Sequence, residues 1–290
     1  MTLSRREFAA LFGVGPQRPA PDPELPTFRA EVRVVEIHVA VFDRRQRPIR
    51  GLMKSDFELI DHNRRREIEI FESEESPITL GLLLDVSGSM LEAIPALKRA
   101  VAELIEQLRP DDQAAIFAFN ERLMLVADFS TDRSGITEAL RRLRPAGRTA
   151  LFDAVALAMQ RLAARSGKKA LVMFTDGKDN SSALSLQSAV RRARIESIQT
   201  HTVAQGEALQ SRALVATLEE IARLTGGLSF RVRKAQEMRE VFAEISKDLS
   251  ASYLLGFTAH PGKGEWRPLK VIVRNHPGAR VRCREGYLAL

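Results

Sequence analysis

The feature that most constrains the fold is an alternation of strand-like and helix-like segments over residues 78–249. The run LGLLLD, which ends at Asp85, is apolar up to its last residue, and KALVMFTD, which ends at Asp176, has the same character. Continuous apolar runs are typical of strands covered on both faces in a parallel sheet. Between them, apolar residues recur at helical spacing, as in the segment from Ile94 to Leu108. The pattern predicts an α/β domain with a doubly wound, mostly parallel sheet of six strands.

Segments of β character flank this domain on both sides. FRAEVRVVEIHVAVFD alternates apolar and polar residues from Phe28 onward, and DFELIDHNRRREIEIFE predicts two short strands around a polar corner. After Leu249, ASYLLGFTAH, LKVIVRN and ARVRCREGY again predict strands. Because each flank is too small for a core of its own, we predict that residues 28–77 and 250–290 pair in one β-sandwich-like unit. The α/β domain of residues 78–249 would then be inserted into this unit.

Residues 1–27 carry a different pattern. MTLSRREFAALFGVG has paired arginines before a short apolar segment and so resembles a twin-arginine export signal. The apolar stretch stops at Pro16 without a small-residue cleavage site, so a basic tail is the alternative interpretation. PQRPAPDPELP then predicts an extended linker. Export would give a periplasmic or extracellular protein, and its absence a cytoplasmic one.

Composition narrows the classes of partner. Lys and Arg number 44 against 37 acidic residues, a net charge of +7, but no aromatic residues are interleaved with the basic helix surfaces. We therefore predict a solvated basic face and no nucleic-acid partner. No run approaches the roughly 18 apolar residues of a membrane span, so no integral membrane segment is expected. The single cysteine, Cys283, excludes an internal disulfide, and we predict a packing role for it, as for Tyr253 and Trp266.

Polar side chains end the first and fourth predicted strands of the α/β domain. In the usual strand order 3-2-1-4-5-6 these two strands are neighbours at the point where the order reverses, which is where such sheets bind ligands. Asp85 and Asp176 should therefore face one crevice. The loop after the first strand adds Ser87 and Ser89, and GRTALFD adds Thr149. Two carboxylates and three hydroxyls form an all-oxygen set suited to Mg²⁺, with Mn²⁺ or Ca²⁺ as alternatives.

These residues also allow interpretations other than a metal site. Asp85 and the two serines could cap the following helix, a role compatible with metal binding. A haloacid-dehalogenase-type phosphatase needs a second carboxylate two residues after the first, but position 87 is serine. Neither a G-x-S-x-G nucleophile turn nor a G-x-x-x-x-G-K phosphate loop occurs, and the five histidines are scattered singly. Asp153 and Asp179 could support the metal-binding loops. The alternative is that they only stabilise a helix N-terminus or a turn.

Together these motifs resemble a known family. D-V-S-G-S at Asp85–Ser89, GRTALFDA with Thr149, and FTDGKDN with Asp176 are similar to the metal-ion-dependent adhesion site of von Willebrand factor type A domains. The resemblance implies a Rossmann-like fold. It also implies that both serines bind the ion directly, that the aspartates bind it directly or through water, and that the threonine joins in the open state. The last coordination position would then be taken by a partner's carboxylate.

The flanking segments are similar to the wider bacterial group of von Willebrand factor A-related proteins. Insertion of such a domain into a β-sandwich also resembles integrin β subunits, an analogy of architecture alone. The sequence thus predicts a non-enzymatic, divalent-metal-dependent adhesion or scaffold module that captures an Asp or Glu carboxylate of a protein partner. Two alternatives stay open: a metal-dependent hydrolase, and a structural metal site without partner coordination.

Overall fold

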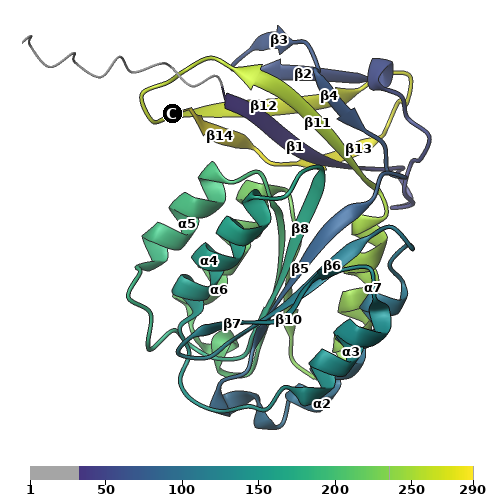
Figure 1. Ribbon diagram of the computed structural model, residues 1–290. Helices are drawn as coiled ribbons and strands as arrows, with labels where there is room; N and C mark the ends of the chain where they lie inside the picture. Colours follow the sequence, from purple (N-terminus) through teal and green to yellow (C-terminus); the bar gives the residue numbers. More distant parts are fainter. Residues whose placement is uncertain (1–32, 235, 290) are drawn as a thin grey trace, which may run out of the picture. The chain divides into compact units, whose positions relative to one another are not determined.

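The computed structural model describes residues 33–234 and 236–289 (Figure 1). The export-signal and linker predictions for residues 1–27 lie outside the described residues. The predicted fold class is confirmed: a six-stranded sheet with the order β10-β9-β8-β5-β6-β7 is flanked by helices, and two further four-stranded sheets accompany it. Numbered along the α/β domain, this is the order 3-2-1-4-5-6 on which the site prediction rests.

The α/β domain begins with β5 and ends with α7. Its elements in chain order are β5 (Ile78–Asp85), η2 (Gly88–Leu91), α2 (Ile94–Glu106), β6 (Gln113–Phe119), β7 (Leu123–Ser130), α3 (Arg133–Arg142), α4 (Leu151–Ala163), β8 (Lys168–Thr175), α5 (Leu186–Ile195), β9 (Gln199–Gln205), η3 (Gly206–Gln210), α6 (Arg212–Thr225), β10 (Ser229–Val232) and α7 (Glu237–Leu249). All pairings are parallel except that of β7 with β6. Helices α2, α3 and α7 cover one face of the sheet, and α4, α5 and α6 cover the other (Figure 1).

The two flanks of the chain form a two-sheet β unit. Its strands are β1 (Arg33–Phe42), β2 (Phe57–Asp61), β3 (Arg64–Arg66), β4 (Ile70–Glu72), β11 (Ser252–Ala259), β12 (Glu265–Val273), β13 (Arg280–Cys283) and β14 (Gly286–Ala289), with the short helix η1 (Lys54–Asp56). The sheet orders are β13-β1-β11-β4 and β14-β12-β2-β3, so each sheet mixes strands from both flanks. Apolar residues of every strand except β3 fill the space between the sheets.

Two details of this unit differ from the sequence prediction. The segment after residue 56 forms three short strands rather than two, and the polar corner is a turn in which His62 and Asn63 have φ values of 47° and 64°. Tyr253 is buried as predicted, but the core prediction for Trp266 is wrong because its side chain is 36% exposed. The Arg194 guanidinium lies 5.8 Å from the Trp266 ring centroid, and this cation–π contact accounts for a large aromatic residue at the surface.

The pairing of the flanks leads to a first testable prediction. A fragment of residues 33–76 should be unfolded alone, because β1 pairs with β11 from residues 33 to 40 and β2 pairs with β12 along its whole length. Without these partners both strands would expose their apolar faces and unpaired backbone groups to water. Circular dichroism should show β structure only when a second fragment, residues 250–289, is added. A cooperative unfolding transition of the first fragment alone would contradict the prediction.

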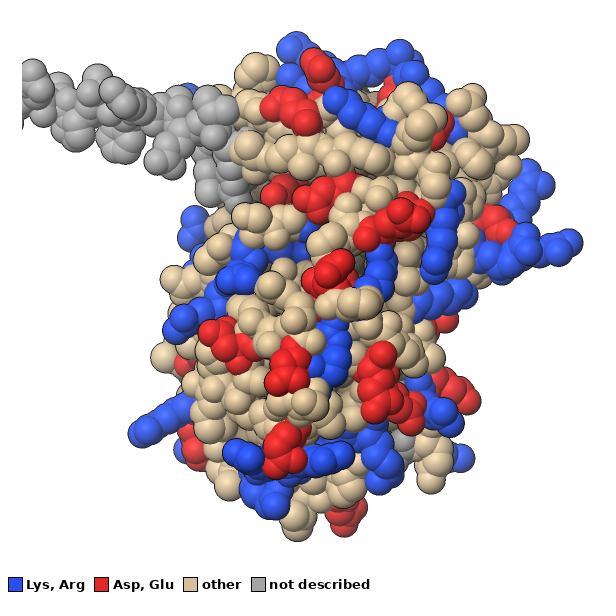
Figure 2. Space-filling model, turned by 45° about the vertical axis from the view of Figure 1, so that its right-hand side comes forward, with Lys and Arg blue, Asp and Glu red and all other residues tan. Residues whose placement is uncertain are grey.

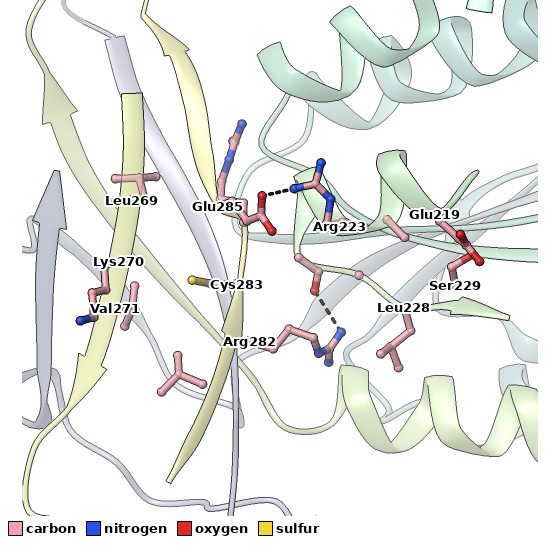
Figure 3. Close-up of a pocket in the computed structure, with 15 residues that line it drawn as sticks. Glu219, Arg223, Leu228, Ser229, Leu269, Lys270, Val271, Arg282, Cys283 and Glu285 are labelled. Atoms are coloured by element: carbon pink, nitrogen blue, oxygen red, sulfur yellow. Dashed lines mark hydrogen bonds and ion pairs between the residues drawn. The ribbon is translucent and has the colours of Figure 1, made fainter. Parts of the chain in front are cut away.

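Polar contacts join the β unit to the base of the α/β domain. The buried Lys168 at the start of β8 donates hydrogen bonds to the carbonyl oxygens of Ser73 (3.1 Å), Glu74 (3.0 Å) and Ser252 (3.0 Å). These three residues lie in the two chain segments that connect the β unit to the α/β domain, one before β5 and one after α7. Figure 3 shows a second contact, where Arg282 of β13 donates to the Gly226 carbonyl oxygen at the end of α6 (3.0 Å). Arg282 and Gly226 are among the residues that line a hollow of about 540 Å³ between α6 and the strands β12 and β13.

The surface is mixed in charge. Figure 2 shows acidic and basic side chains interspersed over one face of the molecule, without a wide area of one sign. Within the described residues, no helix combines the length and apolar character needed to cross a membrane.

Candidate metal site

The two aspartates of the predicted site lie at one edge of the central sheet. Strands β5 and β8 are parallel neighbours with Leu84 opposite Phe174, so Asp85 and Asp176 leave the sheet side by side. The Thr175 hydroxyl donates a hydrogen bond to Asp85 Oδ2 (2.8 Å) and so links the ends of the two strands directly. The point where the strand order reverses therefore carries both carboxylates, as the sequence predicts.

The loop after β5 connects these carboxylates through its two serines. The Ser87 amide donates to Asp85 Oδ1 (2.8 Å), the Ser87 and Ser89 hydroxyl oxygens are 3.0 Å apart, and the Ser89 hydroxyl donates to Asp176 Oδ1 (2.9 Å). Ser87 precedes η2 but makes no side-chain cap hydrogen bond to it, so helix capping does not account for this hydroxyl. Four of the five predicted residues thus form one hydrogen-bonded chain.

Thr149 completes the cluster from the loop before α4. A β-carbon built on Gly177 would lie 3.2 Å from Thr149 Oγ1 and 3.5 Å from Ser89 Oγ, so both hydroxyls face the backbone at this glycine. Asn180 fixes the position of Thr149, because Asn180 Oδ1 accepts a bond from the Thr149 amide (3.0 Å) and the Asn180 amide donates to the Thr149 carbonyl (3.0 Å). All five predicted residues are therefore brought together.

Asp153 and Asp179 lie in the loop network rather than against the five residues. Asp179 accepts bonds from the Phe152 amide (3.1 Å) and from Ser182, whereas Asp153 accepts from the amides of Ala183 (2.9 Å) and Leu184 (2.8 Å). Both carboxylates fasten the loop after β8 to the first turn of α4. Whether they also support metal binding stays a prediction.

Burial gives the cluster its electrostatic character. Asp85 is 0% exposed and Asp176 is 5% exposed, whereas Ser89 is exposed and opens the cluster to solvent. Burial raises the pKa of Asp176 to about 6, and the charges of Asp85 and Glu207 add to the effect. Burial also raises the pKa of Asp85, against the hydrogen bonds that it accepts. Within the described residues, neither carboxylate has an ion pair with Lys or Arg.

This donor set fits a hard divalent cation. Two carboxylates and three hydroxyls are all oxygen ligands, as Mg²⁺ and Ca²⁺ require, and a cation here would offset the repulsion between the buried carboxylates. In the described part of the chain no group of three or more His, Cys, Asp or Glu side chains is arranged to hold a metal. The fit therefore depends on the hydroxyls, and the identity of the ion stays a prediction.

Sequence reasoning missed three residues that shape this site. Thr175 donates a hydrogen bond to Asp85. Gly177 leaves room for the hydroxyls of Thr149 and Ser89, and Asn180 holds Thr149 in place. Thr175 had a weak signal, since it is the polar end of a strand that is otherwise apolar after its two lysines. Asn180 ends the FTDGKDN segment, but its role could not be predicted because its contact with Thr149 spans 31 residues and appears only after folding.

Comparison with known proteins agrees with this geometry. Residues 80–178, which contain all five clustered residues, match the family model of the von Willebrand factor type A domain. Residues 80–178 are therefore similar to a von Willebrand factor type A domain. A structure described as von Willebrand factor type A from Catenulispora acidiphila shares the fold, with a TM-score of 0.55 and 16% identity over 90% of this chain and 75% of that one. The likeness in fold thus extends beyond the α/β domain into the β unit.

Two curated relatives each match 60% or more of this chain. An uncharacterized protein of Synechocystis is 29% identical over 66% of this chain and 43% of its own length. A UPF0353 protein of Mycobacterium avium is 24% identical over 60% of this chain and 62% of its own length. The chain thus spans less than two thirds of the length of either relative.

Proposed function

We propose that this protein is a non-enzymatic binding module. In this proposal Asp85, Ser87, Ser89, Thr149 and Asp176 hold a divalent cation, Mg²⁺ in the first instance, and a partner protein supplies an Asp or Glu carboxylate to it. Type A domains are generally protein-interaction and adhesion modules, which supports the class of function. The metal dependence and the carboxylate of the partner are our extension of that class.

One observation carries the proposal: two buried carboxylates and three hydroxyls converge where the sheet order reverses, and only Ser89 is exposed. The hydroxyls are neutral, so a bound divalent cation would keep unbalanced positive charge toward solvent and attract an anionic side chain there. The residues of this chain orient the oxygens, while Thr175 and Asn180 prevent Asp85 and Thr149 from turning away.

The two alternative functions, a metal-dependent hydrolase and a purely structural metal site, differ from this proposal in what they require. A metal-dependent hydrolase needs a general base beside the cation. His38 and His201, the two histidines that are buried, lie on β1 and in the middle of β9, away from this sheet edge. A purely structural site predicts that cation raises the unfolding temperature without changing the capture of any protein.

Cation binding is tested with an isosteric substitution. Asp85→Asn should weaken Mg²⁺ binding, measured by calorimetry, at least about 100-fold, because it removes one of two negative charges from the donor set. Asp111→Asn, at an exposed aspartate outside the cluster, is the matched control and should bind as the unaltered protein does. Equal Mg²⁺ affinity in the two variants would contradict the proposed ligand set.

Partner capture is tested separately. Immobilised protein should retain a protein partner from a lysate in Mg²⁺ and release it with chelator, and the Asp85→Asn protein should retain none. Carboxylate capture further predicts that blocking the partner's Asp and Glu residues by amidation abolishes retention. Retention that survives both chelator and Asp85→Asn would overturn the adhesion mechanism, even if Mg²⁺ binds.

A further inference from the structure

A second concave site lies on the β unit. Two turns from opposite ends of the chain, residues 43–49 after β1 and residues 275–279 before β13, line a hollow of about 570 Å³. The turns are neighbours because β1 pairs with β13, with Phe42 opposite Arg280. Their sequences, DRRQRPI and NHPGA, place three arginines on one side of the hollow.

The turn geometry leaves two of these arginines without an acidic partner. Asp43 accepts hydrogen bonds from the amides of Arg45 (2.8 Å) and Arg47 (2.9 Å) and from the Arg47 guanidinium (2.8 Å). Its charge is therefore engaged in holding the turn, and these bonds, with the Arg47 amide first, lower its pKa. Within the described residues, Arg44 and Arg45 have no ion pair, and both are exposed.

The opposite turn brings Arg44 against the wall of the hollow. Gly278 has a φ of 92°, and a β-carbon there would lie 2.3 Å from Arg44 Nε. The Arg44 guanidinium thus occupies the space that any side chain at position 278 would need. This packing places the Arg44 guanidinium at the wall of the hollow.

We propose that this hollow binds a small phosphate monoester. Its lining carries three arginines and one aspartate, a net charge of +2 with His276 neutral. A phosphate monoester carries about −1.5 to −2 at pH 7 and so matches that charge, whereas one carboxylate supplies −1. Guanidinium groups bind phosphate oxygens through paired N–H donors. Ile49, Pro277 and Ala279 add apolar surface for the carbon-bearing part of the ligand.

The same lining argues against two other anionic partners. No Phe, Tyr or Trp side chain lines the hollow, so the large aromatic stacking platform that single-stranded nucleic acid uses is absent there. The exposed large apolar residues of the described chain all lie outside the two turns, so the rim has no side chain to insert into a lipid surface. A soluble phosphate monoester is therefore the ligand that charge, size and surroundings favour.

The test is a calorimetric titration with inorganic phosphate and glycerol phosphate at constant ionic strength. Chelator is present throughout, so that no cation at Asp85 and Asp176 can hold phosphate. Both probes should bind, and Arg44→Gln with Arg45→Gln should weaken binding at least tenfold without changing the unfolding temperature. Arg161→Gln with Arg212→Gln removes two exposed charges elsewhere and should leave binding unchanged.

Several outcomes would overturn the proposal. These are the absence of phosphate binding, equal loss in the two double variants, and acetate binding as tight as that of glycerol phosphate. Binding only to vesicles that contain phosphatidic acid would assign the hollow to a lipid surface instead. Tighter binding of a polyglutamate peptide than of either phosphate would assign it to an acidic protein segment.

Discussion

Replacing Lys168 with methionine is expected to lower the free energy of unfolding by at least about 3 kcal/mol. Lys168 is 1% exposed, and its ammonium group donates to three carbonyl oxygens, those of Ser73, Glu74 and Ser252. Burial lowers its pKa to about 8, so the group is still mostly charged at neutral pH and offers one proton to each carbonyl. Methionine fills similar space but leaves these buried acceptors without that donor.

The same lysine binds both chain segments that connect the α/β domain to the β unit. Urea unfolding of Lys168→Met beside Lys270→Met, which removes an exposed lysine of β12, isolates the effect of burial. The β12 variant should unfold within about 0.5 kcal/mol of the unaltered protein. If both variants unfold at the same urea concentration, the three hydrogen bonds contribute no net stability. The two connecting segments are then held by packing alone.

The sequence predicted the fold well where its pattern was periodic and long. The apolar runs ending at Asp85 and Asp176 and the helical spacing from Ile94 onward reflect burial on both faces of the sheet and on one face of the helix. Short segments were less predictable. The second strand predicted after the polar corner is divided into β3, which pairs with β2, and β4, which pairs with β11 about 180 residues later. No local pattern encodes this division.

The candidate site divides in the same way. Asp85, Ser87 and Ser89 are adjacent in sequence, and the strand-order rule was enough to bring Asp176 beside them. The supporting contacts of Thr175 and Asn180 depend on side-chain positions that follow only from the folded loops. The core prediction for Trp266 was wrong because a large aromatic residue is usually buried. Here the Arg194 guanidinium packs over the Trp266 ring at the surface.

Acid should destabilise the protein through two histidines buried near the junction. His38 on β1 is 2% exposed and His201 on β9 is 0% exposed. Burial lowers the pKa of His38 to about 3, aided by the charges of Lys169 and Lys168, and lowers the pKa of His201 well below its usual value. Below pH 6.5 the unfolded chain binds protons that the folded chain excludes, so stability falls as pH falls. His38 alone should cost about 2 kcal/mol between pH 6.5 and 4.5, and His201 should add a loss in the same direction.

The raised pKa values of Asp85 and Asp176 act in the opposite direction, because there the folded chain takes up protons first. The histidine contribution must therefore be measured as a difference between variants. His38→Leu and His201→Asn each remove one titrating group, and asparagine can keep the acceptor that the Leu228 amide uses at His201 Nδ1 (3.2 Å). Urea unfolding in chelator should show a shallower loss from pH 6.5 to 4.5 in each variant, by about 2 kcal/mol for His38→Leu, whereas exposed His276→Gln should follow the unaltered protein. Parallel curves for all four proteins would mean that His38 and His201 take up protons without unfolding, through water that reaches the junction.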